Sequence, residues 1–153
     1  ISFPIKDLTG RIVAFNCRTQ SMTDVPKYLI HPPKAVLPLF PARVRPIKGR
    51  VILVEGIFDM LNLHDKGLNN VICCFGTRNV DIEKLKLLKM QGVESVDILF
   101  DPDDAGQEAS IKIQEMCEIA EILSKNVKIP VALGDAGALN KEKVKQLKEQ
   151  LYG

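Results

Sequence analysis

The stretch Phe100-Asp101-Pro102-Asp103-Asp104-Ala105-Gly106 joins the two patterns that decide the fold. A run over residues 96–100, apolar except for Asp97, leads directly into three carboxylates, and a long helical pattern follows. This order is typical of a buried strand that ends in an acidic loop, with a helix beginning just behind it. The acids also allow a simpler interpretation, because Asp103 or Asp104 could serve only as the N-cap of that helix.

A second stretch has the same shape, since residues 51–54 are apolar and run into Glu55-Gly56. If both strands belong to one parallel sheet, its carboxyl edge brings together Glu55, Asp101 and Asp103. Converging carboxylates raise one another's pKa unless a cation keeps them ionised. Carboxylate oxygens without softer ligands suit Mg²⁺ or Mn²⁺. Glu-Gly after a strand can be only a turn, but two acidic strand ends together favour a metal site.

Strand and helix patterns alternate from Arg50 to the end of the chain. The predicted strands are 51–55, 71–75, 96–100 and 127–132, and the predicted helices are about 57–66, 81–91, 104–124 and 140–151. Gly67 and Gly92 stand just past two of these helices, where a terminating glycine is common. Such alternation predicts an α/β fold, with a mainly parallel sheet flanked by helices.

The first part of the chain has a different character. Residues 1–31 predict a small, β-rich antiparallel unit, because short apolar runs alternate with turn residues. Residues 32–49 hold five prolines, which exclude a long helix and predict a stiff, extended connector. We therefore divide the chain into a basic unit over 1–49 and an α/β unit over 50–153.

Charge is distributed unevenly along the 153 residues. Residues 1–50 carry nine Lys or Arg against two Asp or Glu, whereas residues 51–153 carry twelve against seventeen. A basic half before an acidic half suggests that one part holds a polyanion and the other performs metal chemistry, although it could also be an incidental split of surface charge. No apolar run approaches the roughly 20 residues that span a bilayer, so no membrane partner is expected.

The cysteines and the N-terminus bear on where the protein works. None of the four cysteines forms a CxxC pair, which argues against a structural zinc site. Cys73 and Cys74 stand in an apolar run and are expected to be buried thiols in a reduced, cytoplasmic protein. The chain starts without Met and without a visible signal peptide, so we expect a processed chain or a fragment of a longer one.

The order of several motifs resembles a known family. Glu55-Gly56-Ile57-Phe58-Asp59, followed by the Asp101–Gly106 stretch, is similar to the Toprim signature of a Glu after one strand and a DxD after a later one. Phe75-Gly76-Thr77, together with Gly10 to Phe15 and Pro26-Lys27-Tyr28-Leu29 upstream, resembles the DnaG-type primases within that group. The resemblance covers about residues 9–150.

The resemblance implies roles for particular residues. Glu55, Asp101 and Asp103 would be the catalytic metal-binding carboxylates for Mg²⁺ or Mn²⁺, with Asp59 in support. The family has a further acidic pair late in the fold, where this chain offers Asp135 and has Gly137 in place of the second acid. Lys27 would lie in the groove that holds template or nucleotide. The other basic candidates for nucleic-acid contact are Arg11, Arg18, Lys34, Arg43 and Arg45.

The implied function is that of a DNA primase core, which makes RNA primers from nucleoside triphosphates on single-stranded DNA, with a replicative helicase as partner. The short, proline-rich connector departs from bacterial primases and favours a phage, plasmid or helicase-linked relative. Two alternatives stay open: a Toprim nuclease that uses water as nucleophile, and a non-catalytic module that binds nucleic acid. A topoisomerase is disfavoured because it needs a nucleophilic tyrosine in a large body. The chain has only Tyr28, expected to pack within the basic unit, and Tyr152.

Overall fold

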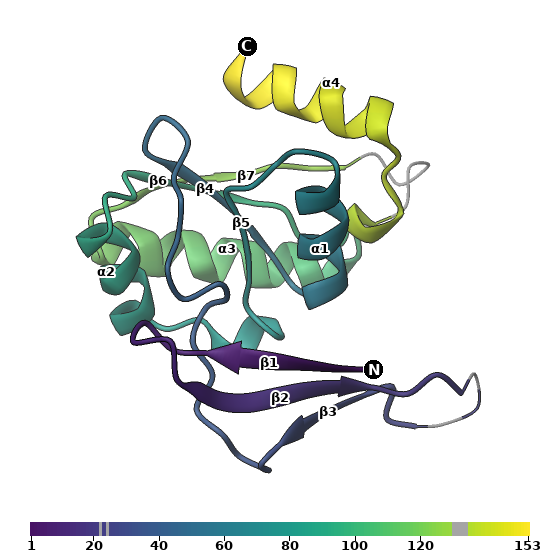
Figure 1. Cartoon of the computed structure of the whole chain (residues 1–153). Helices are drawn as coiled ribbons and strands as arrows, with labels where there is room; N and C mark the ends of the chain where they lie inside the picture. The colour runs from purple at the N-terminus through teal and green to yellow at the C-terminus, as the bar shows by residue number, and fades with distance from the viewer. Residues whose placement is uncertain (22, 24, 130–134) are drawn as a thin grey trace.

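The computed structural model describes residues 1–21, 23, 25–129 and 135–153, which form two sheets (Figure 1). The N-terminal sheet is antiparallel, in the order β1-β2-β3. Its strands are β1 (Ser2–Lys6), β2 (Ile12–Arg18) and β3 (Tyr28–His31). This sheet is the small β-rich unit that the sequence predicts.

The second sheet has four parallel strands in the order β5-β4-β6-β7. These strands are β4 (Arg50–Val54), β5 (Val71–Cys73), β6 (Ser95–Ile98) and β7 (Leu123–Asn126). The helices between and after them are α1 (Ile57–Asp65), α2 (Ile82–Met90), α3 (Asp104–Ile119) and α4 (Lys141–Tyr152), with 3-10 turns η1 (Thr77–Asn79) and η3 (Ala136–Ala138). The predicted α/β class, with a parallel sheet between helices, is confirmed.

The sheet is buried on both faces because successive side chains of a strand point to opposite sides. Val51 and Leu53 of β4 pack in the cluster that contains α2 and α3. Ile52 and Val54 pack in the cluster that contains α1 and α4. All four side chains are fully buried. The near-continuous apolar run of β4 is therefore what a central parallel strand requires.

The last strand corrects the sequence prediction. The predicted helix 104–124 ends at Ile119, where Glu121 takes a φ of +55° and the Ile122 amide donates to the Cys117 carbonyl at 2.9 Å. Leu123 lies inside the predicted helix, yet it begins β7 and is 74% exposed. The strand predicted at 127–132 lies earlier in the chain, because β7 spans Leu123–Asn126 and residues 127–129 are not part of a strand. The rest of that prediction, residues 130–132, lies outside the described residues.

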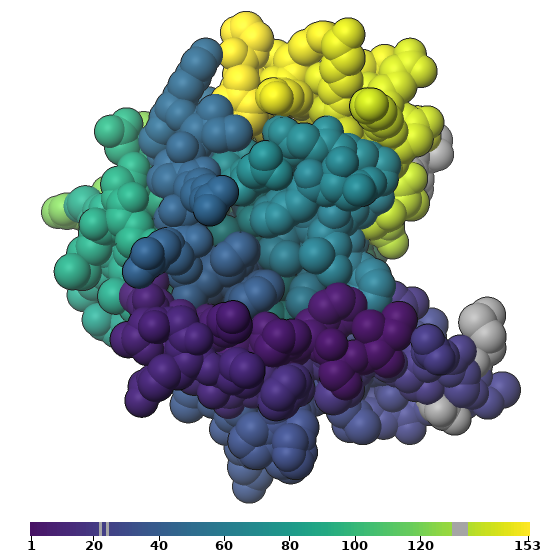
Figure 2. Space-filling view, viewed as in Figure 1, coloured from purple at the N-terminus to yellow at the C-terminus, as the bar shows by residue number. Residues whose placement is uncertain are grey.

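The connector 32–49 contains no helix and runs along the edge of the parallel sheet. Phe40 and Cys73 pair as an antiparallel bridge, with N–H to O distances of 2.9 and 2.7 Å. Leu39 packs in the cluster of α2 and α3, whereas Leu37 packs with Ile5 of the N-terminal sheet. In Figure 2 the purple N-terminal strands accordingly lie directly against the blue connector.

A buried ion pair closes the amino end of the parallel sheet. Arg50 donates from Nε and Nη2 to the two carboxylate oxygens of Asp97, at 3.0 and 2.6 Å, and Asp97 is fully buried. The Arg50 guanidinium also lies 5.8 Å from the ring centroid of Tyr152. The last turn of α4 is thereby held against the end of the sheet opposite the acidic loops.

Two further expectations concern buried thiols and membrane spans. Cys73 and Cys74 are fully buried and carry free thiols, as predicted. Among the residues that the structure describes, no helix is both long and apolar enough to cross a membrane.

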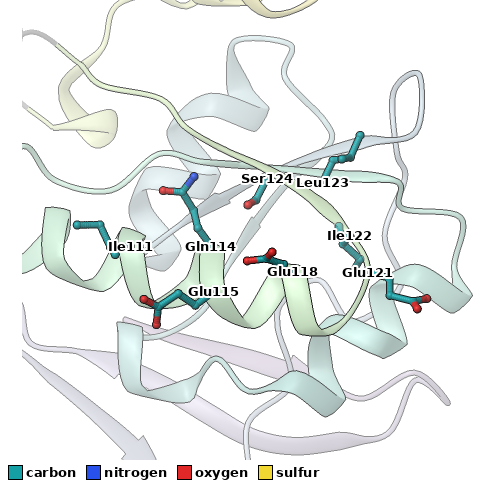
Figure 3. Close-up of a pocket in the computed structure, with 8 residues that line it drawn as sticks. All are labelled: Ile111, Gln114, Glu115, Glu118, Glu121, Ile122, Leu123 and Ser124. Carbon is teal, nitrogen blue, oxygen red and sulfur yellow. The ribbon is translucent and has the colours of Figure 1, made fainter.

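An open groove of about 620 Å³ lies between the second half of α3 and the start of β7 (Figure 3). Glu115 and Glu118 of α3 lie along it, and the other side is lined by Ile122, which precedes β7, and by Leu123, its first residue. This groove is far along α3 from the acidic stretch at its N-terminus.

Candidate metal centre and nucleic-acid interface

The first acidic loop is built where β4 passes into α1. Glu55 follows the last residue of β4, and Gly56 is the N-cap of α1 in an extended conformation. Asp59, at the third helical position, accepts a hydrogen bond from the Gly56 amide at 3.1 Å. The Gly76 amide, which follows β5, donates to the Glu55 carbonyl at 3.2 Å. Glu55 is therefore held on a short loop that is fixed from both sides.

The second acidic loop joins β6 to α3. Asp103 is the N-cap of α3, and its Oδ1 accepts from the Gly106 amide at 2.7 Å. Gly106 is required by packing, since a Cβ there would overlap the carbonyl oxygen of Asp101. Asp104 is exposed in the first helical turn. Asp103 therefore does cap the helix, and the cap together with the close packing at Gly106 places Asp101 and Asp103 against the start of α3.

The third acidic loop carries Asp135 and accounts for the glycine at 137. Asp135 is the N-cap of η3, and its Oδ1 accepts from the Ala138 amide at 2.9 Å. A Cβ built on Gly137 would lie 2.8 Å from Oδ1 of Asp59 and 3.3 Å from Oδ1 of Asp135. The carboxylate of Asp59 already fills the space beside residue 137, so no side chain fits there without displacing it.

Electrostatic coupling shows that the three loops converge. The pKa of Asp59 is raised to about 6, with burial as the largest cause; the charges of Asp101 and Asp135 contribute to the rise, and hydrogen bonds from the backbone amides of Gly56 and Gly137 oppose it. Burial also raises the pKa of Asp101, with contributions from Asp135 and Asp103.

The pKa of Glu55 is raised in the same way. Burial is the largest cause, and the charges of Asp101, Asp103 and Asp59 add to it, while a hydrogen bond from the Asp101 amide opposes the shift. Carboxylates that repel one another across three loops form a site where a cation would be stabilised.

The donor set fits a hard divalent cation. It consists only of carboxylates on loops at strand ends, which is the chemistry that Mg²⁺ and Mn²⁺ prefer. Asp103 uses Oδ1 for the helix cap and keeps its second oxygen for another partner. Within residues 1–21, 23, 25–129 and 135–153, no three His, Cys, Asp or Glu side chains are already close enough together to hold a metal ion. Glu55, Asp101 and Asp103 would therefore have to move closer together to bind one.

An arginine and aromatic cluster lies next to the first acidic loop. The Arg18 guanidinium carbon is 4.4 Å from the ring centroid of Phe58 and 5.3 Å from that of Tyr28, and its Nη1 donates to the Tyr28 hydroxyl at 3.1 Å. The rings of Phe3 and Phe58 meet edge-on, with centroids 5.5 Å apart. Phe58 immediately precedes Asp59 on α1. Tyr28 thus packs within the N-terminal unit, as expected, and also reaches across to α1.

The structure does not gather all the basic candidates at one place. Arg18 ends β2, and exposed Lys27 precedes β3, so both lie on the side of Phe58. Arg11 stands at the other end of β2, where it forms an ion pair with Asp7 at 3.1 Å. Lys34 is exposed in the turn after β3.

Arg43 and Arg45 lie apart from the acidic loops, on the connector. They line a cavity of about 360 Å³ beside β5, together with His64 and Asn69. Of the six basic candidates, Arg18 and Lys27 are therefore the ones on the side of the N-terminal unit that meets α1.

Sequence reasoning missed two contributors to this site. Phe58 lies inside the motif from Glu55 to Asp59, but an aromatic residue on an amphipathic helix usually indicates a core position. Its contact with the Arg18 guanidinium, which joins α1 to the N-terminal sheet, can be recognised only in the structure. Asn62 donates from Nδ2 to the carbonyls of Ala136 and Leu139 at 2.9 and 3.0 Å. Its spacing of three from Asp59 places both on one helix face, which is the only sequence signal for it.

Comparison with known proteins gives concordant matches. The Toprim-like family model matches residues 52–150. A DNA primase of Chlamydia trachomatis is 31% identical over 160 residues, covering 99% of this chain and 27% of the relative. The chain thus spans about a quarter of the length of the curated relatives it matches.

Solved structures agree with these matches. The Aquifex aeolicus primase, with its zinc-binding and RNA polymerase domains, has a TM-score of 0.82 at 30% identity, over 98% of this chain and 38% of that one. A DNA primase domain from Pseudomonas aeruginosa has a TM-score of 0.68 at 27% identity, over 90% of this chain and 45% of that one.

Proposed function

Because the chain belongs to the Toprim-like family, we propose that it is the catalytic core of a DNA primase, a nucleotidyltransferase that makes RNA primers on single-stranded DNA. The matches to DNA primases over nearly the whole chain support this proposal. The observation that carries it is the convergence of three acidic loops beside a basic, aromatic surface from the N-terminal unit.

The proposed division of labour follows the two units of the chain. Residues 50–153 would perform the chemistry, and residues 1–49 would guide template or nucleotide toward it. Lys27 and Arg18 would contact phosphate groups, and the ring of Tyr28, which is 42% exposed, offers a surface on which a base can stack. A replicative helicase is proposed as protein partner on the family resemblance alone.

The acidic residues would act by holding divalent cations. Glu55, Asp101 and Asp103 would be the ligands, with Asp59 and Asp135 beside them. When bound, Mg²⁺ or Mn²⁺ lowers the pKa of the attacking 3′-hydroxyl and neutralises charge on the phosphate oxygens. The free N–H groups at the start of α3 favour an anion near Asp103, such as the triphosphate of an incoming nucleotide. The ligands lie on short loops that are anchored by hydrogen bonds at the start of α1 and α3, so a small movement of these loops would bring them together around a cation.

Primer synthesis on single-stranded DNA, with labelled nucleotides and Mg²⁺ or Mn²⁺, tests the proposal. The assay uses this chain and the longest natural protein that contains it. Asp101→Ala and Asp103→Ala should each lower the rate by about 100- to 1000-fold, the usual loss when one electrostatic stabiliser of a transition state is removed. Asp104→Ala is the matched control and should have little effect, and Asp135→Ala should fall in between.

Three results would contradict the proposal. Synthesis that survives both substitutions would remove the metal-site assignment. Template cleavage without synthesis would move the protein to the nuclease alternative. Binding of single-stranded DNA with neither reaction in the longest natural protein would indicate a non-catalytic module.

A further inference from the structure

The carboxylates on the three acidic loops repel one another, so their charges cannot hold the loops together. A Cβ built on Gly137 would lie 2.8 Å from Oδ1 of Asp59 and 3.3 Å from Oδ1 of Asp135, so these two carboxylates lie close together on either side of residue 137. Like charges at such a distance repel, which acts to push the turn that carries Asp135 away from α1. Contacts other than charge are therefore needed to hold this turn in place before any cation binds.

Asn62 makes that contact. Its Nδ2 donates to the carbonyl of Ala136 at 2.9 Å and to the carbonyl of Leu139 at 3.0 Å, so one amide group spans the whole η3 turn. The side chain of Lys66 donates to Oδ1 of Asn62. This second contact fixes which way the amide faces, with its oxygen toward Lys66 and its nitrogen toward the turn.

Packing around Asn62 adds to these two hydrogen bonds, and together they form what we call the clamp on the η3 turn. Ala136 and Leu139 are buried and pack in the same apolar cluster as Met60 of α1. One turn of helix before Asn62, the carboxylate of Asp59 fills the space beside Gly137. Asn62 therefore holds both ends of the η3 turn by hydrogen bonds. The middle of the turn leaves room for the carboxylate of Asp59 only because Gly137 has no side chain.

We propose that Asn62 is a positioning residue that holds the η3 turn against α1, so that Asp135 faces the other carboxylates before a metal ion binds. The inference rests on the proposed metal site and deepens it. An amide suits the task because it donates without adding charge. A carboxylate at 62 would face two carbonyl oxygens with no proton to offer, in a place already crowded with negative charge.

The test measures Mn²⁺ affinity by electron paramagnetic resonance in the absence of nucleotides. Asn62→Ala should weaken Mn²⁺ binding by about 10-fold or more, as substitutions of outer-shell partners of metal ligands do. Asn62→Asp, of the same size, should weaken it further. Asn79→Ala is the matched control, because Asn79 also donates from Nδ2 to two carbonyls, those of Leu37 and Cys74, away from η3. It should leave Mn²⁺ affinity unchanged.

A second measurement needs no metal. Hydrogen exchange of the Ala138 amide, which donates to Asp135 at 2.9 Å, should quicken by about 10-fold in Asn62→Ala, since the turn then opens more often. Exchange in β4 and β6 reports whether the fold as a whole is intact. The Asn79 control should leave the Ala138 amide as it is in the wild type.

The outcomes separate this inference from the proposed function. If the wild type binds Mn²⁺ and Asn62→Ala binds it equally well, the positioning role is wrong. If the wild type binds no Mn²⁺, the metal-site proposal fails, and the exchange of Ala138 alone decides whether Asn62 holds the turn. Equal exchange in wild type and Asn62→Ala would overturn the clamp whatever the metal result.

Discussion

Replacing Asp59 with Asn should change how the stability of the metal-free protein depends on pH. The pKa of this carboxyl is about 6 in the fold, against 3.8 when it is free in water. The folded state therefore favours the protonated form, so this group adds stability as pH falls through 6 and has added most of it near 4. Between pH 7 and about pH 4 the gain is about 2 kcal/mol for this one group, at 1.36 kcal/mol per pKa unit. The amide of Asp59→Asn cannot titrate, and the variant should lose that gain.

At pH 7 two effects oppose each other in Asp59→Asn. Relief of the buried charge favours the variant by up to about 3 kcal/mol. The variant also loses an acceptor for the Gly56 or Gly137 amide, which costs about 1 to 3 kcal/mol. The difference between wild type and variant across the pH range is therefore more informative than the value at one pH.

Urea unfolding from about pH 4 to pH 7, with a chelator present, measures this difference. The free energy of unfolding of the wild type should fall relative to that of Asp59→Asn as pH rises. Saturating Mg²⁺ at pH 7 should raise the free energy of unfolding of the wild type relative to that of Asp59→Asn, because a cation stabilises the ionised cluster of the wild type. A difference that stays constant across the pH range would refute the reasoning, since burial and the neighbouring carboxylates would then not raise the pKa of Asp59.

Three further predictions address other parts of the chain. Changing Lys27, Arg43 and Arg45 to Ala should flatten the slope of log K against log salt concentration for single-strand binding, by roughly 0.7 for each phosphate that the variant no longer neutralises. Fluorescence titration at several salt concentrations measures this slope, and an unchanged slope would mean that these residues do not touch phosphate. Asp97→Ala should destabilise the fold by about 3 to 5 kcal/mol in urea, because it leaves a partly buried guanidinium unpaired, and a loss below about 1 kcal/mol would contradict the importance of that ion pair. Gly106→Ala should cost about 1 to 3 kcal/mol and slow primer synthesis, since the added carbon displaces the acidic loop; full activity and stability in the same preparation would show that the loop adapts freely.

The sequence predicts the parallel sheet well because apolar runs that end in acids mark the carboxyl ends of strands. Val51 to Val54 and Val96 to Phe100 have no polar interruption except Asp97, which the structure explains by its pairing with Arg50. The convergence of Glu55 and Asp101 follows from the topology alone. Their assignment as metal ligands stays a prediction.

Other features depended on contacts that no local pattern contains. Leu123 continued the spacing of α3 in sequence, but the strand that it begins is determined by pairing with Ser95 in β6. Gly137 looked like a missing acid, and only the position of Asp59 in space shows why glycine stands there. Asn62 carries no motif at all, because its partners are backbone carbonyls more than seventy residues away.

The bridge between Phe40 and Cys73 supplies a built-in chemical reporter. Burial raises the pKa of both neighbouring thiols, that of Cys74 to about 12, so neither reacts with an alkylating reagent while the sheet is closed. Cys73 pairs with the connector through its backbone and packs with α1 and α4, whereas Cys74 packs on the opposite face with α2 and α3. The ratio of the two labelling rates therefore distinguishes opening of the α1 and α4 face of the sheet from opening of the α2 and α3 face, with natural residues alone.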